Sequence, residues 1–95
     1  MTGVQYRVQT TGHRVEKEIA RIHPSDRKRI VAAIRQLPED PRPPGIRQLE
    51  PNVFRLRIGD YRVIYKVLDA EKVILVGRVA RRSESTYRDL RHLFE

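Results

Sequence analysis

A twelve-residue stretch in the middle of the chain, FRLRIGDYRVIY at residues 54–65, has the pattern of a tight β-hairpin. β-Branched and aromatic residues fill both arms, and Gly59-Asp60 between them is a two-residue turn signal. A loop of this length fixes the register of the two strands. The predicted cross-strand pairs are Ile58 with Tyr61, Arg57 with Arg62, Leu56 with Val63 and Arg55 with Ile64.

Alternation along the two arms separates their side chains onto two faces. One face carries Arg55, Arg57 and Arg62. The other face is apolar and carries Phe54, Leu56, Ile58, Tyr61, Val63 and Tyr65. Like charges placed directly across a strand pair are destabilising, so the Arg57–Arg62 pair gives up stability that a bound anion would recover. The hairpin therefore predicts an anion-binding face.

The overall charge agrees with an anionic partner. The chain has 95 residues, which predicts a single domain over residues 1–95. It carries 20 Lys+Arg against 12 Asp+Glu, a formal net charge of +8, and a pI of about 10.6. These values favour a polyanionic partner. Sixteen of the 20 basic residues are arginine, whose planar fork suits phosphate oxygens. A GC-rich genome or a hot habitat would also raise the arginine content, and this alternative applies best to the scattered residues.

The composition also excludes several classes of protein. There is no cysteine, which excludes disulfides, thiol nucleophiles and cysteine-based zinc sites. The sequence shows no cluster of metal ligands, so neither a metal nor another cofactor is expected. The longest apolar run is a few residues, and the amino terminus lacks the apolar region of a signal peptide. We therefore expect no membrane association and a cytoplasmic location.

Periodicity along the chain predicts an α+β fold. Residues 4–8 alternate like a short first strand, and two stretches with helical spacing follow, separated by His23-Pro24. Residues 38–45 hold four of the six prolines and predict a stiff connector. Residues 46–49 are expected to begin a strand that Pro51-Asn52 interrupts before the hairpin. A further strand at residues 73–79 and a helix at residues 83–95 complete the order β-α-α-β-β-β-α, with an antiparallel three-stranded meander, a four-stranded sheet overall and a C-terminal helix.

A second register argument places the remaining arginines. If residues 69–72 form a four-residue loop, Leu68 pairs with Val73 and Arg62 pairs with Val79. By parity, Arg81 then shares the face of Arg55, Arg57 and Arg62. The same register sets Gly77 opposite Ile64, where it would leave a hollow, and turns Arg78 toward the helices. A bulge in this strand would reverse the parity.

The chain resembles the RelE/ParE superfamily of bacterial and archaeal toxins. The resemblance is carried by GDYRVIY at residues 59–65, ARRSESTYR at residues 80–88, DPRPPG at residues 40–45, and a Leu-x-x-x-x-x-Arg-x-Arg entry into the hairpin. It extends over nearly the whole chain. It implies a toxin of a type II toxin–antitoxin system. RelE-like members are ribosome-dependent endoribonucleases that cut messenger RNA (mRNA) in the A site, whereas ParE-like members share the fold and poison DNA gyrase.

The resemblance also implies an active site. Carried onto this chain, the catalytic positions of the nuclease branch are Arg55, Arg57, Arg62, Arg81 and Tyr87. The chemistry is attack of a ribose 2′-OH on the adjacent phosphate. Arg57 and Arg62 would stabilise charge, Arg81 would act at the leaving group, and Tyr87 would orient a base by stacking. The chain departs from the best-known RelE pattern, which has lysines where this chain has Arg55 and Arg57. Arginine stays protonated and is a poor base.

Each of several other residues has both a functional and a structural interpretation. Glu50 is either the missing base or a solvent-facing carboxylate. Arg27, Lys28 and Arg29, with Arg82 near the end of the last strand, either bind RNA or form solvated surface. The tail stripe of Tyr87, Leu90 and Phe94 either packs on the core or occupies a site that an antitoxin segment can take. His13, His23 and His92 are expected to be structural or exposed.

The expected partners follow from the resemblance: a cognate antitoxin, the ribosome, and mRNA in the A site. The toxin is expected to be a monomer alone and to form a higher-order complex with its antitoxin. Two alternatives remain at this point. The chain could be a ParE-like gyrase inhibitor without RNase activity, or a catalytically weak toxin that acts with its antitoxin as an operator-binding corepressor.

Overall fold

The computed structural model describes residues 5–82 and 90–94. Its elements in chain order are β1 (Arg7–Thr10), α1 (His13–Ala20), α2 (Pro24–Gln36), β2 (Arg47–Glu50), β3 (Val53–Ile58), β4 (Tyr61–Leu68), β5 (Val73–Arg81) and α3 (Leu90–Leu93). The strands form one mixed sheet in the order β1-β5-β4-β3-β2. Strand β1 is parallel to β5, and the other neighbouring strands are antiparallel.

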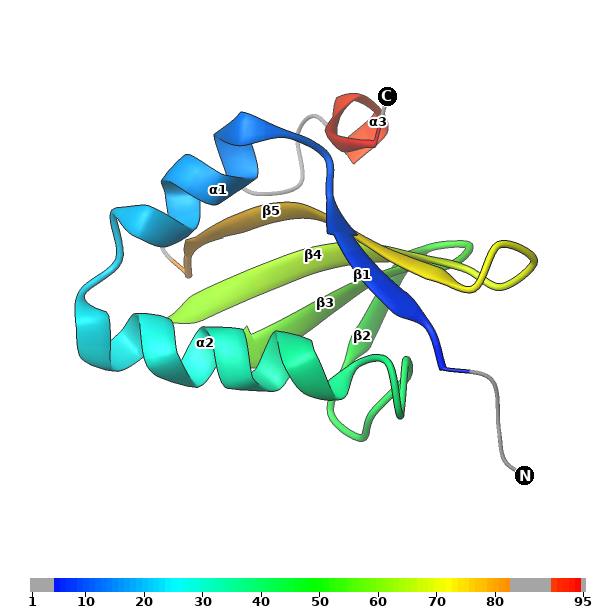
Figure 1. Ribbon diagram of the computed structural model, residues 1–95, viewed down its shortest axis with the longest axis horizontal. Coiled ribbons are helices and arrows are strands. Elements are labelled where there is room, and N and C mark those ends of the chain that lie inside the picture. The colour runs from blue at the N-terminus through cyan, green and yellow to red at the C-terminus, as the bar shows by residue number, and fades with distance from the viewer. Residues whose placement is uncertain (1–4, 83–89, 95) are drawn as a thin grey trace.

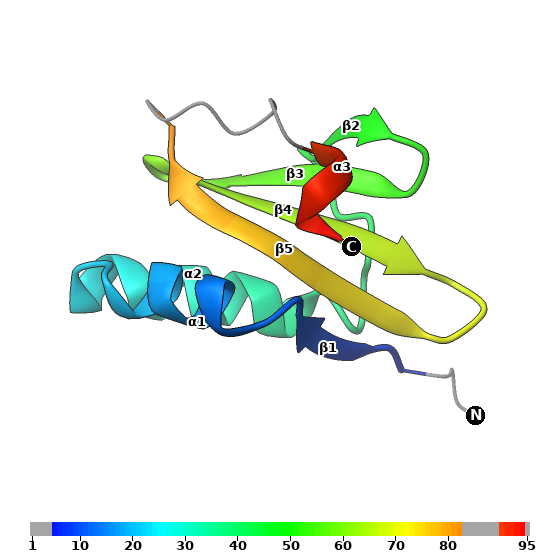
Figure 2. The same cartoon turned by 90° about the horizontal axis from the view of Figure 1, so that it is seen from above.

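Helices lie on both faces of the sheet. The hairpin of α1 and α2 covers one face, and the short α3 lies on the opposite face (Figures 1 and 2). Among the described residues, no helix combines the length and the apolar character that crossing a membrane requires. The two faces of the sheet therefore have different coverings, and the face under α3 is the less covered one.

The main core fills the space between the helical hairpin and the sheet. Val15 from α1 and Ile30 from α2 are fully buried, and they belong to one apolar cluster with Val63 and Tyr65 of β4. Burying an aliphatic side chain of this size contributes about 1.5–3 kcal/mol. The apolar side of the 54–65 hairpin faces this core: its buried or partly buried members are Phe54, Leu56, Ile58, Tyr61, Val63 and Tyr65. The predicted separation of faces is confirmed.

The hairpin register is also confirmed. Each predicted pair is present: Ile58 with Tyr61, Arg57 with Arg62, Leu56 with Val63, and Arg55 with Ile64. The turn requires a left-handed residue, and Gly59 supplies it at φ 57°. The register follows from this local feature.

The predicted sheet differs from the observed one in two respects. The four-stranded antiparallel prediction is wrong, because the described residues form a five-stranded mixed sheet. Pro51-Asn52 does not interrupt a strand; it turns the chain between β2 and β3, with Asn52 at φ 63°. Asparagine is one of the few non-glycine residues that tolerate this conformation. Strand β1 pairs in parallel with β5, which the local pattern did not reveal.

The C-terminal helix is shorter in the described residues than predicted. The predicted range was 83–95, whereas α3 covers Leu90–Leu93. The remainder of that range, Tyr87 included, lies outside the described residues apart from Phe94. Phe94 packs with Leu93 against a small cluster that includes Val53 and Ile64. The core-packing reading of the tail stripe is therefore confirmed for Phe94.

Strand β5 contains a bulge that the second register argument missed. Leu68 pairs with Val73 as predicted, and regular pairing continues to Tyr65 with Val76. The next pair is Ile64 with Arg78, so Gly77 is the extra residue. A single inserted residue reverses which face the later side chains point to.

Two side chains of α1 complete the edge of β5 beside the bulge. Arg14 donates from Nη2 to the carbonyl of Gly77 at 2.7 Å, and Glu18 accepts from the amide of Val79 at 2.9 Å. Arg14 and Glu18 also bond to each other at 2.9 Å. Strand β1 has ended before this point, so the two side chains take up backbone groups that a neighbouring strand would otherwise pair.

The proline-rich connector is tied to the far end of the sheet. Tyr65 donates its hydroxyl to the carbonyl of Pro41 at 2.8 Å. Arg42 bonds to the carboxylate of Asp69 at 2.9 Å and lies over the ring of Phe54. Tyr6 donates to the other oxygen of Asp69 at 2.6 Å. Asp69 therefore joins the connector, the β4–β5 turn and the start of β1.

We expect the free energy of unfolding to fall at acid pH as Asp69 is protonated. The hydrogen bonds from Arg42 and Tyr6 hold the pKa of Asp69 below its ordinary value. Because the pKa of Asp69 is lower in the folded protein than in the unfolded chain, its ionised form stabilises the fold at pH values above the unfolded-state pKa, near 3.9. This stabilisation is lost as the pH falls through the folded-state pKa. We expect the free energy of unfolding of Asp69→Asn to vary less with pH than wild type below about pH 4. Urea titrations at a series of pH values test this, and parallel curves for the two proteins would contradict it.

Candidate active site

Arginines from four neighbouring strands lie on the sheet face opposite α1 and α2. Cross-strand pairing places them: Arg57 is opposite Arg62, and Arg47 is opposite Arg55. Arg78 pairs with Ile64, which itself pairs with Arg55. Paired residues share a face, so these side chains lie on one surface. We call this surface the arginine face; its members are Arg47, Arg55, Arg57, Arg62 and Arg78.

The side chains of the arginine face are partly held by packing. Arg55, Arg62 and Arg78 are half-buried, and the Nε atom of each is buried. Arginine commonly buries its stem in this way and keeps its charged end toward water. Arg57 is exposed. A planar fork held by its stem loses less conformational freedom when it binds an oxyanion than a freely rotating one does.

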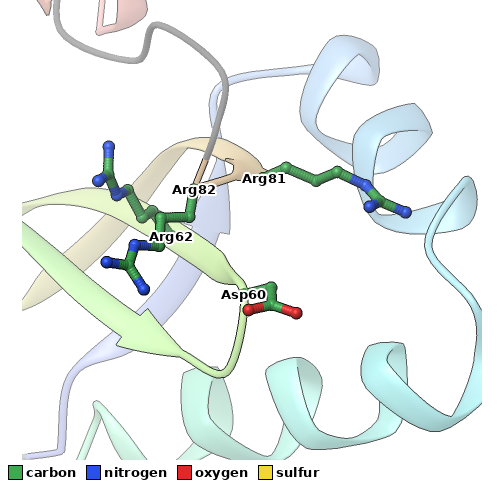
Figure 3. A pocket seen from close by; sticks show the side chains of 4 residues that line it. All are labelled: Asp60, Arg62, Arg81 and Arg82. Atoms are coloured by element: carbon green, nitrogen blue, oxygen red, sulfur yellow. The ribbon is translucent and has the colours of Figure 1, made fainter.

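A hollow lies at the rim of the sheet, beside the turn of the β3–β4 hairpin. Its volume is about 370 Å³, and it is lined by Asp60, Arg62, Arg81 and Arg82. The amide of Arg82 donates to the carbonyl of Asp60 at 2.6 Å, which joins the end of β5 to the turn. Figure 3 shows Arg62 and Arg82 directed to one side and Arg81 directed to the other, toward α1. Arg82 therefore extends the arginine face to the rim.

The prediction that Arg81 shares the arginine face is wrong. Arg81 pairs with Tyr61, and its guanidinium carbon lies 5.6 Å from the centre of that ring, on the helix side of the sheet. The bulge at Gly77 is the physical reason, because it exchanges the sides of Arg81 and Arg78. Arg78, which was predicted to face the helices, occupies the arginine face instead.

Glu50 lies at the wrong end of the hairpin to act as the base. It pairs with Val53, whereas the Arg57–Arg62 pair adjoins the β3–β4 turn. Arg57 follows Val53 by four positions, which corresponds to about 13 Å along a strand. A general base must come within hydrogen-bond reach of the hydroxyl it deprotonates. The alternative reading is the better one, because Glu50 is exposed.

The three basic residues that open α2 have separate environments. Arg27 donates to the carbonyl of Ala20 at 3.2 Å and so joins α2 to the end of α1. Lys28 is exposed. Arg29 lies against the hairpin turn: a Cβ built on Gly59 would be 3.3 Å from its Nη2 atom. Arg29 is therefore the one member of this group that lies close to the hairpin.

The histidines are exposed, as predicted. His13 lies 3.9 Å from the carboxylate of Glu16 at the surface of α1. His23 caps α2 by accepting the amide hydrogen of Ser25, and Pro24 follows as the first helical residue. Within the described residues, no three His, Asp or Glu side chains are grouped closely enough to hold a metal ion.

Helix α3 covers the apolar middle of the arginine face. Leu93 and Phe94 pack on Val53 and Ile64. Ile64 lies between Arg55 on β3 and Arg78 on β5, so α3 rests between these two arginines. Arg57 and Arg62 lie nearer the rim. Within the described residues, the contacts of Leu93 and Phe94 therefore fall on the part of the face away from the hairpin turn.

Comparison with known proteins identifies the class of protein that this fold and site define. A family model described as the ParE toxin of the type II toxin–antitoxin system parDE matches residues 6–86. A protein named toxin RelE1 from Methanocaldococcus jannaschii is 33% identical over 81 residues, covering 80% of this chain and 89% of that protein. The chain belongs to the ParE/RelE family of toxins.

Solved structures of relatives show the same fold. The RelE–RelB complex of Pyrococcus horikoshii OT3 matches with a TM-score of 0.77 and 28% identity, over 85% of this chain and 99% of that chain. The RelBE toxin–antitoxin complex of E. coli matches with a TM-score of 0.73 and 22% identity, over 84% of this chain and 99% of that chain. The chain is thus a RelE-like toxin with the α+β fold of these proteins.

Proposed function

We propose that this toxin is a ribosome-dependent endoribonuclease that cuts mRNA, and that the arginine face holds the scissile phosphate. The observation that carries the proposal is the direct pairing of Arg57 with Arg62, flanked by Arg55 and Arg78 on the same surface. Like charges directly across a strand pair repel each other, and a bound anion would offset the repulsion between Arg57 and Arg62. A phosphodiester supplies the charge and the paired oxygens that arginine forks recognise.

The chemistry is attack of a 2′-OH on the adjacent phosphate: the bond between the 2′ oxygen and phosphorus forms as the bond to the 5′ oxygen breaks. The products are a 2′,3′-cyclic phosphate and a 5′-hydroxyl, so the proton lost by the 2′-OH is balanced by the one that the 5′ oxygen gains from solvent. Negative charge grows on the phosphate oxygens as the new bond forms. Arg57 and Arg62 stabilise this charge by bidentate hydrogen bonds, and the buried stem of Arg62 keeps its donors in place before the reaction. Arginine does not give up its proton at neutral pH. The arginine face therefore contributes charge stabilisation and positioning, which alone account for a large part of many enzymatic rate enhancements.

Two further parts of the proposal come from the family. Tyr87, which lies outside the described residues, provides an aromatic surface for a base next to the scissile phosphate. The partner that holds the toxin inactive is a cognate antitoxin, because the RelE proteins of P. horikoshii and E. coli are found in complexes with RelB. The ribosome presents the messenger in the A site.

Mapping of RNA ends in growing cells tests the proposal. The toxin is induced without an antitoxin, and the 5′ ends of cellular messages are sequenced. We expect new ends within translated regions, because the enzyme reaches the message on the ribosome. Untranslated RNAs in the same cells serve as the internal control and should stay intact. Growth arrest with all messages intact would disprove the nuclease.

A gyrase inhibitor is the second candidate. It is favoured by the description of the matching family model, which is ParE. It is also consistent with arginine at both hairpin positions, Arg55 and Arg57. This function predicts inhibition of supercoiling by purified gyrase and an early DNA-damage response while translation continues. Unchanged supercoiling at a stoichiometric excess of toxin would exclude it.

A further inference from the structure

Arg81 lies in a second cationic environment on the helix side of the sheet. Its guanidinium rests 5.6 Å from the ring centre of Tyr61, a side chain that is only 7% exposed. Cation–π contact holds the side chain over this fixed ring. Figure 3 shows it directed toward α1 and away from Arg62. Within the described residues, neither Arg81 nor Arg21, the residue that caps the end of α1, makes an ion pair.

Two hollows lie along α1, and the first of them extends to the end of β5. The first, of about 240 Å³, is lined in part by Glu18, Arg21, Tyr61 and Arg81. The second, of about 330 Å³, is lined by Arg14, Lys17, Glu18 and Arg21. Glu18 and Arg21 line both hollows, so the two hollows lie next to each other. We call this pair of hollows the α1 groove and define it by Lys17, Arg21 and Arg81.

Among the described residues, Glu18 is the one carboxylate that lines the α1 groove, and it is already engaged. Glu18 bonds to Arg14 through one oxygen and to the amide of Val79 through the other, each at 2.9 Å. Its charge is therefore matched by Arg14. The cations that remain along the groove are Lys17, Arg21 and Arg81, all exposed. The groove is an anion-binding surface of its own.

The α1 groove continues into the arginine face over the rim of the sheet. Arg81 lines the α1 groove and also the rim hollow, whose other walls include Arg62 and Arg82. Cationic side chains therefore lie on both sides of the rim, and the exposed carboxylate of Asp60 also lines the rim hollow. A chain of regularly spaced phosphates fits such a path. An acidic peptide would fit the α1 groove alone, but the continuity with the arginine face favours nucleic acid.

We propose that Arg21 and Arg81 form a second phosphate-binding subsite, so that a single RNA strand crosses the rim between the arginine face and the α1 groove. This inference rests on the proposed nuclease function and assigns Arg81 to binding. The strand is either the messenger itself or a segment of ribosomal RNA, which present the same phosphodiester chemistry.

Salt dependence of binding tests the subsite. The full-length chain is titrated with a short single-stranded RNA blocked against cleavage by 2′-O-methylation, at several KCl concentrations. Each phosphate contact to a single strand contributes about 0.7 to the slope of log K against log salt. We expect Arg21→Ala/Arg81→Ala to lower that slope by about 1.4. The matched control is Arg7→Ala/Arg35→Ala, which removes the same charge from exposed positions on β1 and α2. The control should retain the wild-type slope.

The outcomes distinguish messenger RNA from ribosomal RNA as the bound strand. They also distinguish failure of the subsite from failure of the proposed nuclease activity. A reduced slope with the free oligonucleotide supports the subsite and identifies the messenger. An unchanged slope there, with reduced salt-dependent affinity for vacant ribosomes, supports it with ribosomal RNA. If the double variant and the control give equal slopes in both assays, the subsite proposal is wrong. It is also wrong if the double variant weakens only the binding of an acidic antitoxin peptide. If wild type fails to cut messages while the slope still falls, the nuclease proposal fails and the subsite stands.

Discussion

We expect Arg62→Ala to slow mRNA cleavage by about 100- to 1000-fold, the range found when one preorganised donor is removed from a site of developing charge. Arg62 faces Arg57 across the hairpin and lines the rim hollow. Its Nε atom is buried, so the side chain is held by packing before substrate arrives. Single-turnover cleavage on programmed ribosomes measures the rate, and rescue of growth in cells that express the variant provides a second readout.

Two further variants make this result specific. Arg62→Lys keeps the charge and loses the planar fork, so its rate should lie closer to that of Arg62→Ala than to wild type if bidentate contact matters. Arg35→Ala removes an exposed cation of α2, away from the arginine face, and should cut at the wild-type rate. Circular dichroism establishes that each variant is folded. A folded Arg62→Ala protein with wild-type cleavage would remove Arg62 from the active site.

The parts of the site that could be predicted are those set by local turns. Gly59-Asp60 defines a two-residue loop, and every cross-strand pair of the hairpin follows from it. The pairing of Arg57 with Arg62 was therefore available from the sequence alone. The same holds for the start of the next ladder, where Leu68 pairs with Val73 across the turn.

The parts that could not be predicted depend on one inserted residue and on non-local pairing. The bulge at Gly77 reverses the parity of β5, and the exchange of Arg78 for Arg81 follows from it. An isolated glycine inside a strand pattern is the available signal for such a bulge. Arg47 was missed because β2 was not recognised as a separate strand; the left-handed Asn52 is the signal there. The parallel pairing of β1 with β5 has no local signature.

Gly77→Ala is expected to destabilise the protein by about 1–3 kcal/mol, the usual cost of overpacking a well-packed site. A Cβ at this position would lie 2.7 Å from the Cε1 atom of Phe94 and 3.2 Å from the Cβ atom of Leu93. Gly77 is not among the positive-φ glycines, so its backbone accommodates alanine. The expected cost therefore comes from the contact with α3. Urea unfolding monitored by circular dichroism measures it.

A double-mutant cycle with Phe94→Ala isolates that contact. Phe94→Ala alone should destabilise the protein, because Phe94 packs on the cluster of Val53 and Ile64. In that background the nearest obstacle to the added methyl is gone, so Gly77→Ala should cost a few tenths of a kcal/mol, and the coupling energy should be of order 1–2 kcal/mol. An equal cost in both backgrounds would assign the requirement for glycine to the bulge itself. The expected coupling would mean that Gly77 has two roles. As the extra residue of the bulge it turns Arg78 onto the arginine face, and its lack of a Cβ allows Leu93 and Phe94 to pack on the sheet.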